Sequence, residues 1–178
     1  MSQHDSSPPH DPFALLQLPR TYAIDRAALT RAWLTATARL HPDRPDAPDD
    51  AARALAVINL ARAELEDDER RAAALLALSG GPSKETDQSL PGGFLVEMLE
   101  TREQAEWDIQ NEGDAARTRW GEWAEQRRAA HRATVTDLFS RHADAPPDSP
   151  AAAAILRDIR RELNAWRYIE RMLEELAR

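Results

Sequence analysis

The C-terminal stretch 150–177 carries the pattern that most restricts how this chain can fold. Its apolar side chains recur at spacings of three, four or seven residues, which places them along one face of an α-helix. Such a helix is stable only if that face is buried against other secondary structure. The residues of this seam are Ile155, Ile159, Trp166, Ile169, Leu173 and Leu176. The sequence therefore predicts a long final helix packed inside a helical domain.

The rest of the chain also favours helix over strand. Alanine is heavily used, β-branched residues are few, and glycine occurs only 6 times in 178 residues, a composition typical of helices. We find neither a strand candidate nor an internal repeat. Two further helical stretches, about 94–112 and 114–142, precede the last one and are separated by Gly113. Three helices with short connections predict an up-down-up bundle.

The first 80 residues predict four shorter helices. Asp11, Asp25 and either Asp67 or Asp68 stand where N-caps are expected, because their side chains can accept hydrogen bonds from the first backbone N–H groups of a helix. Pro19 is expected to end the first helix. The predicted segments are 11–18, 26–40, 49–65 and 67–78. A tight loop would make the second and third helices antiparallel.

The segment SGGPSKETDQSLPGG (79–93) is the clearest linker because it is rich in glycine, proline and serine. Residues 1–10 are polar, contain two prolines and predict a disordered tail. His4 and His10 lie in this tail, where we expect no metal site. The predicted domains are 11–78 and 94–178, joined by the linker 79–93.

Charge and cysteine content exclude several functions. The net charge of −8 argues against non-specific binding to nucleic acids or anionic membranes. The absence of cysteine excludes disulfides, thiolate zinc sites and thiolate-held iron–sulfur clusters. The charge is unevenly spread, since no acidic residue lies between Arg26 and Pro42, whereas 81–178 holds 14 basic and 19 acidic residues. Two domains with different charge suit two different protein partners.

No apolar run approaches the roughly 20 residues of a membrane span. The N-terminal residues lack the basic start and apolar stretch of a signal peptide, and the first arginine is Arg20, which is unlike a mitochondrial transit peptide. We therefore expect a cytoplasmic protein.

The tripeptide His41-Pro42-Asp43 is the sharpest motif in the chain. Alone it is an ordinary proline-bearing turn, but here it occupies the loop between two predicted helices and follows the acid-free basic helix. In this context LHPDR (40–44) resembles the J domain of co-chaperones of DnaK-type ATPases. The J-domain fold that this implies is an antiparallel helical hairpin with the HPD motif in its loop.

The resemblance extends over residues 11–177 to the HscB family, the J-domain co-chaperones of iron–sulfur cluster assembly. The segments that carry it, besides HPD, are DPFALLQLP (11–19), INLARAELEDDERRAAALLAL (58–78), FLVEMLETREQAEWD (94–108) and WRYIERMLEEL (166–176). HPD alone indicates only a J domain. The segment from Phe94, placed after a linker in a helical C-terminal domain, indicates the HscB family.

The resemblance implies that HPD contacts the ATPase chaperone and stimulates ATP hydrolysis. Pro42 restricts the loop, and the Asp43 carboxylate can form charge-assisted hydrogen bonds with a cationic partner. The arginines offer a basic surface to an acidic partner, although each could also belong to an ordinary solvated helix face. The expected chaperone-binding residues are His41, Pro42, Asp43, Arg26, Arg31, Arg39 and Arg44.

A second site is expected on the helix that begins at Phe94, where two stripes can be drawn. Phe94, Met98, Ala105 and Ile109 suit the bundle core. The second stripe is Leu95, Val96, Leu99, Glu100, Glu103 and Trp107. The resemblance implies that the iron–sulfur scaffold protein binds Leu95, Val96, Leu99, Glu100, Glu103 and Tyr168. Alternatively, the J domain buries this stripe. Trp107 stands where the family pattern suggests an acidic residue.

Together these features predict an all-α co-chaperone without catalytic residues, cofactor or metal. It would bind the scaffold protein, deliver it to a DnaK/HscA-type chaperone and promote cluster transfer. The alternative is a J-domain co-chaperone for another client, with a purely structural C-terminal bundle. An enzyme is disfavoured because no nucleotide-binding, GxSxG or HExxH motif occurs. Trp120, Trp123 and Trp166 could serve the core or a homodimer.

Overall fold

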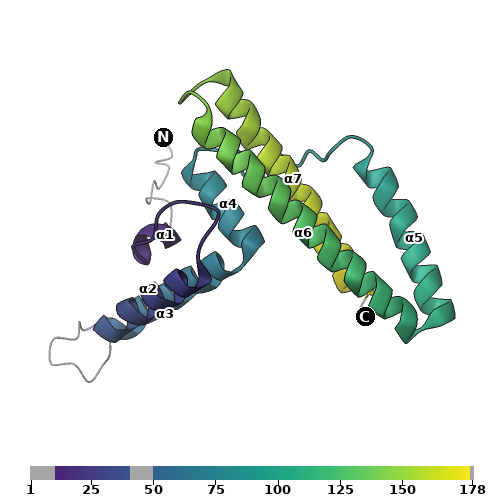
Figure 1. Cartoon of the computed structure of the whole chain (residues 1–178), viewed down its shortest axis with the longest axis horizontal. Coiled ribbons are helices and arrows are strands. Elements are labelled where there is room, and N and C mark those ends of the chain that lie inside the picture. The colour runs from purple at the N-terminus through teal and green to yellow at the C-terminus, as the bar shows by residue number, and fades with distance from the viewer. Residues whose placement is uncertain (1–10, 41–49, 177–178) are drawn as a thin grey trace, which may run out of the picture. The chain divides into compact units, whose positions relative to one another are not determined.

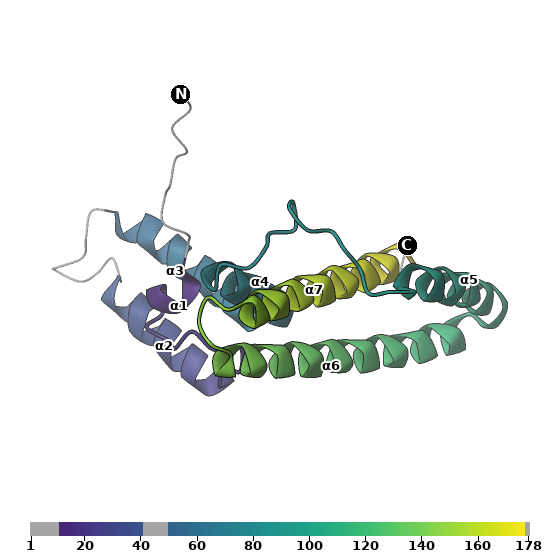
Figure 2. The same ribbon diagram turned by 90° about the horizontal axis from the view of Figure 1, so that it is seen from above.

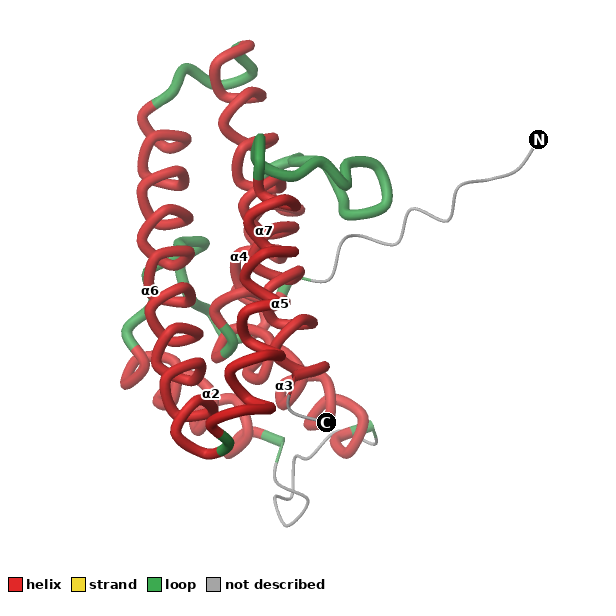
Figure 3. The backbone as a smooth tube through the Cα atoms, turned by 90° about the vertical axis from the view of Figure 1, so that its right-hand side faces the viewer, coloured by secondary structure: helices red, strands yellow, loops and turns green. Residues whose placement is uncertain are grey.

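The computed structural model describes residues 11–40 and 50–176 of the chain, and all regular structure within them is helical (Figure 3). The predicted all-α fold is thereby confirmed. The helices are α1 (Pro12–Leu15), α2 (Arg26–Arg39), α3 (Ala51–Glu66), α4 (Asp68–Leu78), α5 (Phe94–Glu112), α6 (Asp114–Asp144) and α7 (Pro150–Leu176). None of these described helices is long and apolar enough to cross a membrane.

The chain divides into two compact units, Met1–Gly80 and Gly81–Arg178. In the first unit, α2 and α3 lie side by side and run antiparallel, while α1 and α4 pack against α3 (Figures 1 and 2). Phe13, Leu65 and Leu76 are fully buried at the centre of this unit. The indole N–H of Trp33 on α2 donates to Asn59 Oδ1 on α3 at 2.8 Å, which joins the two helices at their surface.

Three of the predicted N-caps are confirmed. Asp11 Oδ1 accepts hydrogen bonds from two backbone N–H groups of α1, each at 3.0 Å. Asp25 Oδ1 accepts from the Ala27 N–H at 2.9 Å, and Asp67 Oδ1 accepts from the Arg70 N–H at 2.8 Å. Each aspartate satisfies donors that the helix itself leaves free, so the helix starts follow from local chemistry.

The predicted end of the first helix is wrong. The helix ends at Leu15 and not at Pro19, because Gln17 takes a left-handed backbone conformation with φ 53°. The Leu18 N–H then donates to Phe13 O at 2.9 Å, and the Gln17 N–H donates to Ala14 O at 3.1 Å. These two bonds form a Schellman motif, which satisfies the last carbonyls of the helix. A glutamine at this position carries no sequence signal for such an ending.

Arg71 holds the first unit together from the inside. Its side chain is buried on α4, with Nε donating to Tyr22 O at 2.8 Å and Nη1 donating to Leu65 O at 2.6 Å. Its third nitrogen pairs with Asp68, and the guanidinium carbon lies 5.0 Å from the centre of the Tyr22 ring. One cation therefore ties α4 to the end of α3 and to the loop that precedes α2.

Replacing Arg71 by Met is expected to lower the free energy of unfolding of this unit by about 3 kcal/mol, because two buried carbonyls lose their donor. Urea unfolding followed by circular dichroism measures the change. Arg70→Met is the matched control, since Arg70 is exposed on the same helix. An equal loss of stability in both variants would contradict the role given to Arg71.

The second unit is a bundle of three helices. The long helices α6 and α7 lie side by side, and α5 packs against both (Figures 1 and 2). The predicted seam of α7 faces inward: Ile159, Trp166 and Ile169 are buried, whereas Leu173 and Leu176 near its end are only half-buried. Phe94 and Met98 of α5 join Ala165 and Ile169 of α7 in one core cluster.

Residues that follow Gly81 are attached to α7. The side-chain amide of Asn164 donates to Asp87 O and to Ser89 O, both at 3.0 Å. Arg160 Nε donates to Pro82 O at 2.9 Å. This part of the predicted linker is therefore fastened to the second unit by side chains of its last helix.

An ion pair joins α6 to α7 beside the core. The guanidinium of Arg128 donates two hydrogen bonds to the carboxylate of Glu170, both at 2.7 Å, and Trp166 Nε1 donates to the same carboxylate at 3.2 Å. The hydrogen bonds from Arg128 lower the pKa of Glu170 below the ordinary value of 4.5, against the opposing effect of burial.

This lowered pKa predicts how the stability of the bundle depends on pH. A carboxyl with a lower pKa in the folded state stabilises the fold above its unfolded pKa, and this contribution is lost as the pH falls through the folded pKa. Acidification below pH 4.5 should therefore lower the melting temperature of the wild-type chain more than that of Glu170→Gln. Glu122→Gln, on the exposed side of α6, should follow the wild type; equal acid sensitivity in all three proteins would contradict the prediction.

Candidate functional site

The HPD motif lies outside the described residues, as do Arg44 and the predicted tail 1–10 with its two histidines. The structure describes the helices on either side of the motif. The preceding helix, α2, ends at Arg39 with Leu40 as its C-cap, and the following helix, α3, begins at Ala51. The motif therefore belongs to the connection between the two antiparallel helices of the hairpin.

Arg26, Arg31 and Arg39 are all exposed on α2. With about 100° of rotation per residue, Arg31 is turned by about 140° from Arg26, and Arg39 by a further 80°. The helix thus brings the three arginines onto its solvent side without aligning them in one row. Arg31 also lies 3.6 Å from Asp25 in an exposed ion pair, which contributes little to stability.

Leu34 is an exposed apolar residue on α2 that the sequence reasoning did not single out. Its exposed fraction is 52%, and it follows Trp33, which faces α3. The signal was present in the sequence: an apolar stripe on this helix consists of Leu29, Trp33, Ala36 and Leu40, and Leu34 lies outside it. The basic surface of α2 therefore includes one large apolar side chain.

The two predicted stripes on α5 are confirmed by burial. Phe94, Met98 and Ala105 are buried and Ile109 is half-buried. The second stripe, which we call the outer face of α5, is exposed throughout and consists of Leu95, Val96, Leu99, Glu100, Glu103 and Trp107. Its four apolar side chains have exposed fractions between 49% and 62%. With a rise of 1.5 Å per residue, the outer face extends about 18 Å along the helix.

The outer face of α5 also carries two carboxylates, those of Glu100 and Glu103. Glu97 and Glu106 of α5 pair with Arg127 and Arg102. Among the described residues, neither Glu100 nor Glu103 forms such a pair. The helix therefore presents exposed apolar side chains next to two carboxylates that are available to a cationic group of a partner.

Contacts with α6 and α7 fix the position of α5. Arg127 of α6 pairs with Glu97, and Arg102 Nη1 of α5 donates to Glu175 Oε2 of α7 at 2.9 Å. Near the other end, the buried Asp108 accepts a hydrogen bond from Trp120 Nε1 at 3.1 Å. Because both ends are fixed on the bundle, the outer face is preorganised, which reduces the entropy lost on binding.

Tyr168 lies where α7 meets the first turn of α5. Its ring packs against Phe94 at 5.6 Å between centroids and 82° between planes, and the side chain is half-buried. Phe94 directly precedes Leu95, so the structure brings Tyr168 close to the N-terminal end of the outer face. Its exposed part can add to that surface, although much of the ring serves the core.

The tryptophans that sequence reasoning grouped together have different surroundings. Trp166 is buried and stacks on His131, with 5.6 Å between centroids and 11° between ring planes. Trp120 packs edge to face against Trp123 at 5.5 Å, and both are half-buried. Trp166 therefore belongs to the bundle core.

The exposed side chains of the outer face of α5 suit contact with a partner protein. In the part of the chain that the structure describes, no group of three metal-ligating side chains comes together. Exposed apolar side chains grouped on one face are uncommon in a monomer and typically mark an interaction site. Aromatic and aliphatic anchors flanked by charges are typical of protein–protein interfaces.

Known proteins with similar sequences match this chain over nearly its full length. The chain is 34% identical over 173 residues to a co-chaperone protein HscB homolog of Bordetella avium, covering 94% of this chain and 95% of that protein. The HscB homolog of Bordetella petrii is 29% identical over 173 residues, with 94% of each chain covered. No family model matches the chain.

Two solved structures share the fold. The chaperone HscB from Vibrio cholerae superposes with a TM-score of 0.60 at 26% identity, covering 93% of this chain and 99% of that one. The crystal structure of the human co-chaperone protein HscB gives a TM-score of 0.67 at 20% identity, covering 95% of this chain and 83% of that one. These values show that the chains share a fold.

Proposed function

The chain belongs to the HscB family of co-chaperones, and we propose that it binds an iron–sulfur cluster scaffold protein and delivers it to a DnaK/HscA-type ATPase chaperone. In this role it stimulates ATP hydrolysis by the chaperone and thereby promotes transfer of the cluster. It acts through two binding surfaces and has no catalytic residues of its own.

The main support for this proposal is the exposure of the apolar side chains on the outer face of α5. Leu95, Val96 and Leu99 are about half exposed or more, and each would be more stable if buried, by about 25 cal/mol per Å² of apolar area. A bundle with a purely structural role gains no stability from exposed apolar side chains, whereas a partner protein that binds this stripe buries them. The carboxylates of Glu100 and Glu103 have no ion-pair partner among the described residues and favour a partner with basic side chains.

The chaperone is bound by the first unit. In this proposal Asp43 pairs with a cationic group of the chaperone, and His41 and Pro42 belong to the same contact. Arg26, Arg31, Arg39 and Arg44 steer an acidic surface of the chaperone toward the motif. Exposed charges of this kind mainly change the association rate, so their individual contributions to affinity are small.

The second candidate is a co-chaperone for another client, in which the C-terminal bundle is only structural. It shares the HPD motif and the arginines with the first candidate. It differs in the outer face of α5, which would then bind no scaffold. The exposure of that face favours the first candidate.

Calorimetric titration of the purified chain with a cluster scaffold protein tests the proposal. We expect saturable binding with one scaffold per chain. The double variant Glu100→Gln, Glu103→Gln should bind more weakly and should be less sensitive to added salt than the wild type, because it removes two exposed charges. Absence of saturable binding by the wild type would exclude the scaffold as the client.

A further inference from the structure

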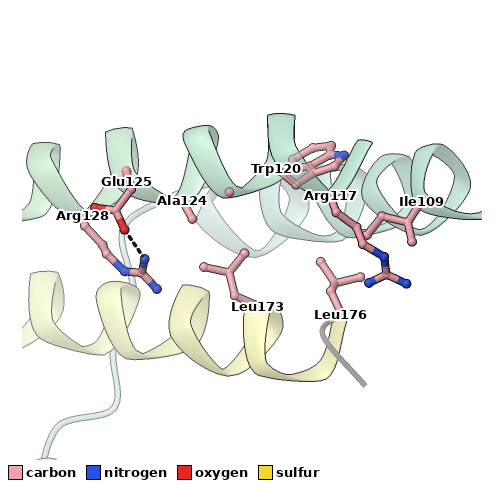
Figure 4. A pocket seen from close by; sticks show the side chains of 9 residues that line it. Ile109, Arg117, Trp120, Ala124, Glu125, Arg128, Leu173 and Leu176 are labelled. Carbon is pink, nitrogen blue, oxygen red and sulfur yellow. Dashed lines mark hydrogen bonds and ion pairs between the residues drawn. The ribbon is translucent and has the colours of Figure 1, made fainter. Parts of the chain in front are cut away.

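A pocket of about 410 Å³ lies between the helices of the second unit, near the end of α7. Its apolar lining includes Ile109 of α5, Trp120 and Ala124 of α6, and Leu173 and Leu176 of α7. Figure 4 shows the two leucines of α7 pointing toward α6. The volume falls within the range of about 300–1,000 Å³ that is typical of small-molecule sites. None of these residues belongs to the outer face of α5.

The pocket contains a glycine that the helix does not require. Gly121 lies in the interior of α6, where a glycine costs about 1 kcal/mol relative to alanine. A Cβ atom added at this position would meet nothing within 4 Å, so close packing does not explain the glycine. Its effect is to leave space on the wall of the pocket.

The aromatic wall of the pocket is held in place. Trp120 Nε1 donates to Asp108 Oδ2 at 3.1 Å, and the ring packs edge to face against Trp123. Asp108 is buried and also accepts a hydrogen bond from Gln104 at 2.7 Å. Because these contacts fix the indole, a ligand would meet a preformed surface.

The two arginines that line the pocket differ in their ion pairs. Arg128 and Glu125 line the pocket and pair with each other, and Arg128 also binds the carboxylate of Glu170. Arg117 also lines the pocket, and Figure 4 shows it extending from α6 toward Leu176. Within the described part of the chain, no carboxylate lies within ion-pair distance of Arg117. The pocket thus combines apolar walls with a guanidinium at its edge that has no ion-pair partner among the described residues.

We propose that this pocket binds a small amphipathic acid, an aliphatic chain with one carboxylate such as a medium-chain fatty acid. The chain lies against Ile109, Leu173 and Leu176, and the carboxylate pairs with Arg117. A carboxylate head satisfies this guanidinium through charge-assisted hydrogen bonds, while the apolar lining removes the aliphatic chain from water.

Titration of the full chain with sodium decanoate below its micelle concentration tests this site. Calorimetry should show saturable binding of one decanoate per chain, and the indole N–H resonance of Trp120, assigned with Trp120→Phe, should shift in NMR spectra. Decanol, which has no charge, should bind about tenfold more weakly or worse, because a hydrogen bond to a charged group contributes about 1.5–3 kcal/mol.

Three variants complete the test. Gly121→Phe fills the pocket and should abolish binding, whereas Gly121→Ala adds only a methyl group and should keep it while raising the melting temperature. Arg117→Gln, at an exposed position, should weaken decanoate binding about tenfold or more and leave decanol binding unchanged. Lack of saturable binding by the wild type, or equal decanoate affinity in Arg117→Gln and wild type, would overturn the proposal. Neither outcome bears on scaffold binding, which uses a different face.

Discussion

Asp43→Asn is expected to reduce the stimulation of a DnaK/HscA-type ATPase to the unstimulated rate. Asparagine has nearly the same size as aspartate but carries no charge, so it removes the ionic part of the contact and keeps the loop sequence otherwise intact. Loss of one partner from a desolvated charge pair costs about 2–5 kcal/mol at an interface, which corresponds to a contact about 30-fold weaker or more. Steady-state phosphate release at fixed chaperone concentration measures the effect.

A matched substitution in the same loop distinguishes the effect of changing the motif from the effect of losing a negative charge elsewhere in the loop. Asp46→Asn removes an equal charge three residues further on and should leave most of the stimulation intact. Both variants should keep the helical circular dichroism of the wild type and its affinity for the scaffold. Full stimulation by Asp43→Asn would show that the chain does not act as a J-domain co-chaperone.

The double variant Leu95→Ala, Leu99→Ala is expected to weaken scaffold binding by about 100-fold. Truncation of two central apolar anchors costs about 1–2 kcal/mol each at a typical interface, and 1.4 kcal/mol corresponds to a factor of ten. Both side chains are about half exposed, so the stability of the bundle should change little. Calorimetric titration with the scaffold measures the loss.

Leu60→Ala is the matched control, because Leu60 is also an exposed leucine on a helix, α3 of the first unit, with an exposed fraction of 65%. It should bind the scaffold like the wild type. The double variant should still stimulate the chaperone in the absence of scaffold. Unchanged scaffold affinity in the double variant would show that the outer face of α5 does not bind the scaffold, and it would favour a purely structural bundle.

Much of the fold could be predicted because its signals are local. Three helices begin where the side chains of Asp11, Asp25 and Asp67 accept hydrogen bonds from the first backbone N–H groups. The inward and outward stripes of α5 followed from the spacing of residues such as Met98 and Leu99, and burial separates the two residues as expected. Periodicity and capping depend on neighbours in sequence, which a single sequence contains.

The remaining features depend on contacts between distant residues. Nothing around Arg71 predicts that it donates to Tyr22, 49 positions earlier. Glu97 and Glu100 look alike in sequence, yet only Glu97 has an ion-pair partner among the described residues, because Arg127 lies on the facing helix. Which glutamates of α5 form ion pairs therefore depends on how α5 packs against α6, and the sequence alone does not reveal this packing.

A steady-state ATPase assay that contains the chaperone, the scaffold and this chain tests most directly whether the chain delivers the scaffold to the chaperone. If one molecule binds both partners, the scaffold and the chain together should raise the hydrolysis rate by more than the sum of their separate effects. Leu95→Ala with Leu99→Ala should remove this synergy and keep the stimulation by the chain alone. Simple addition of the two separate effects in the wild type would contradict delivery of the scaffold.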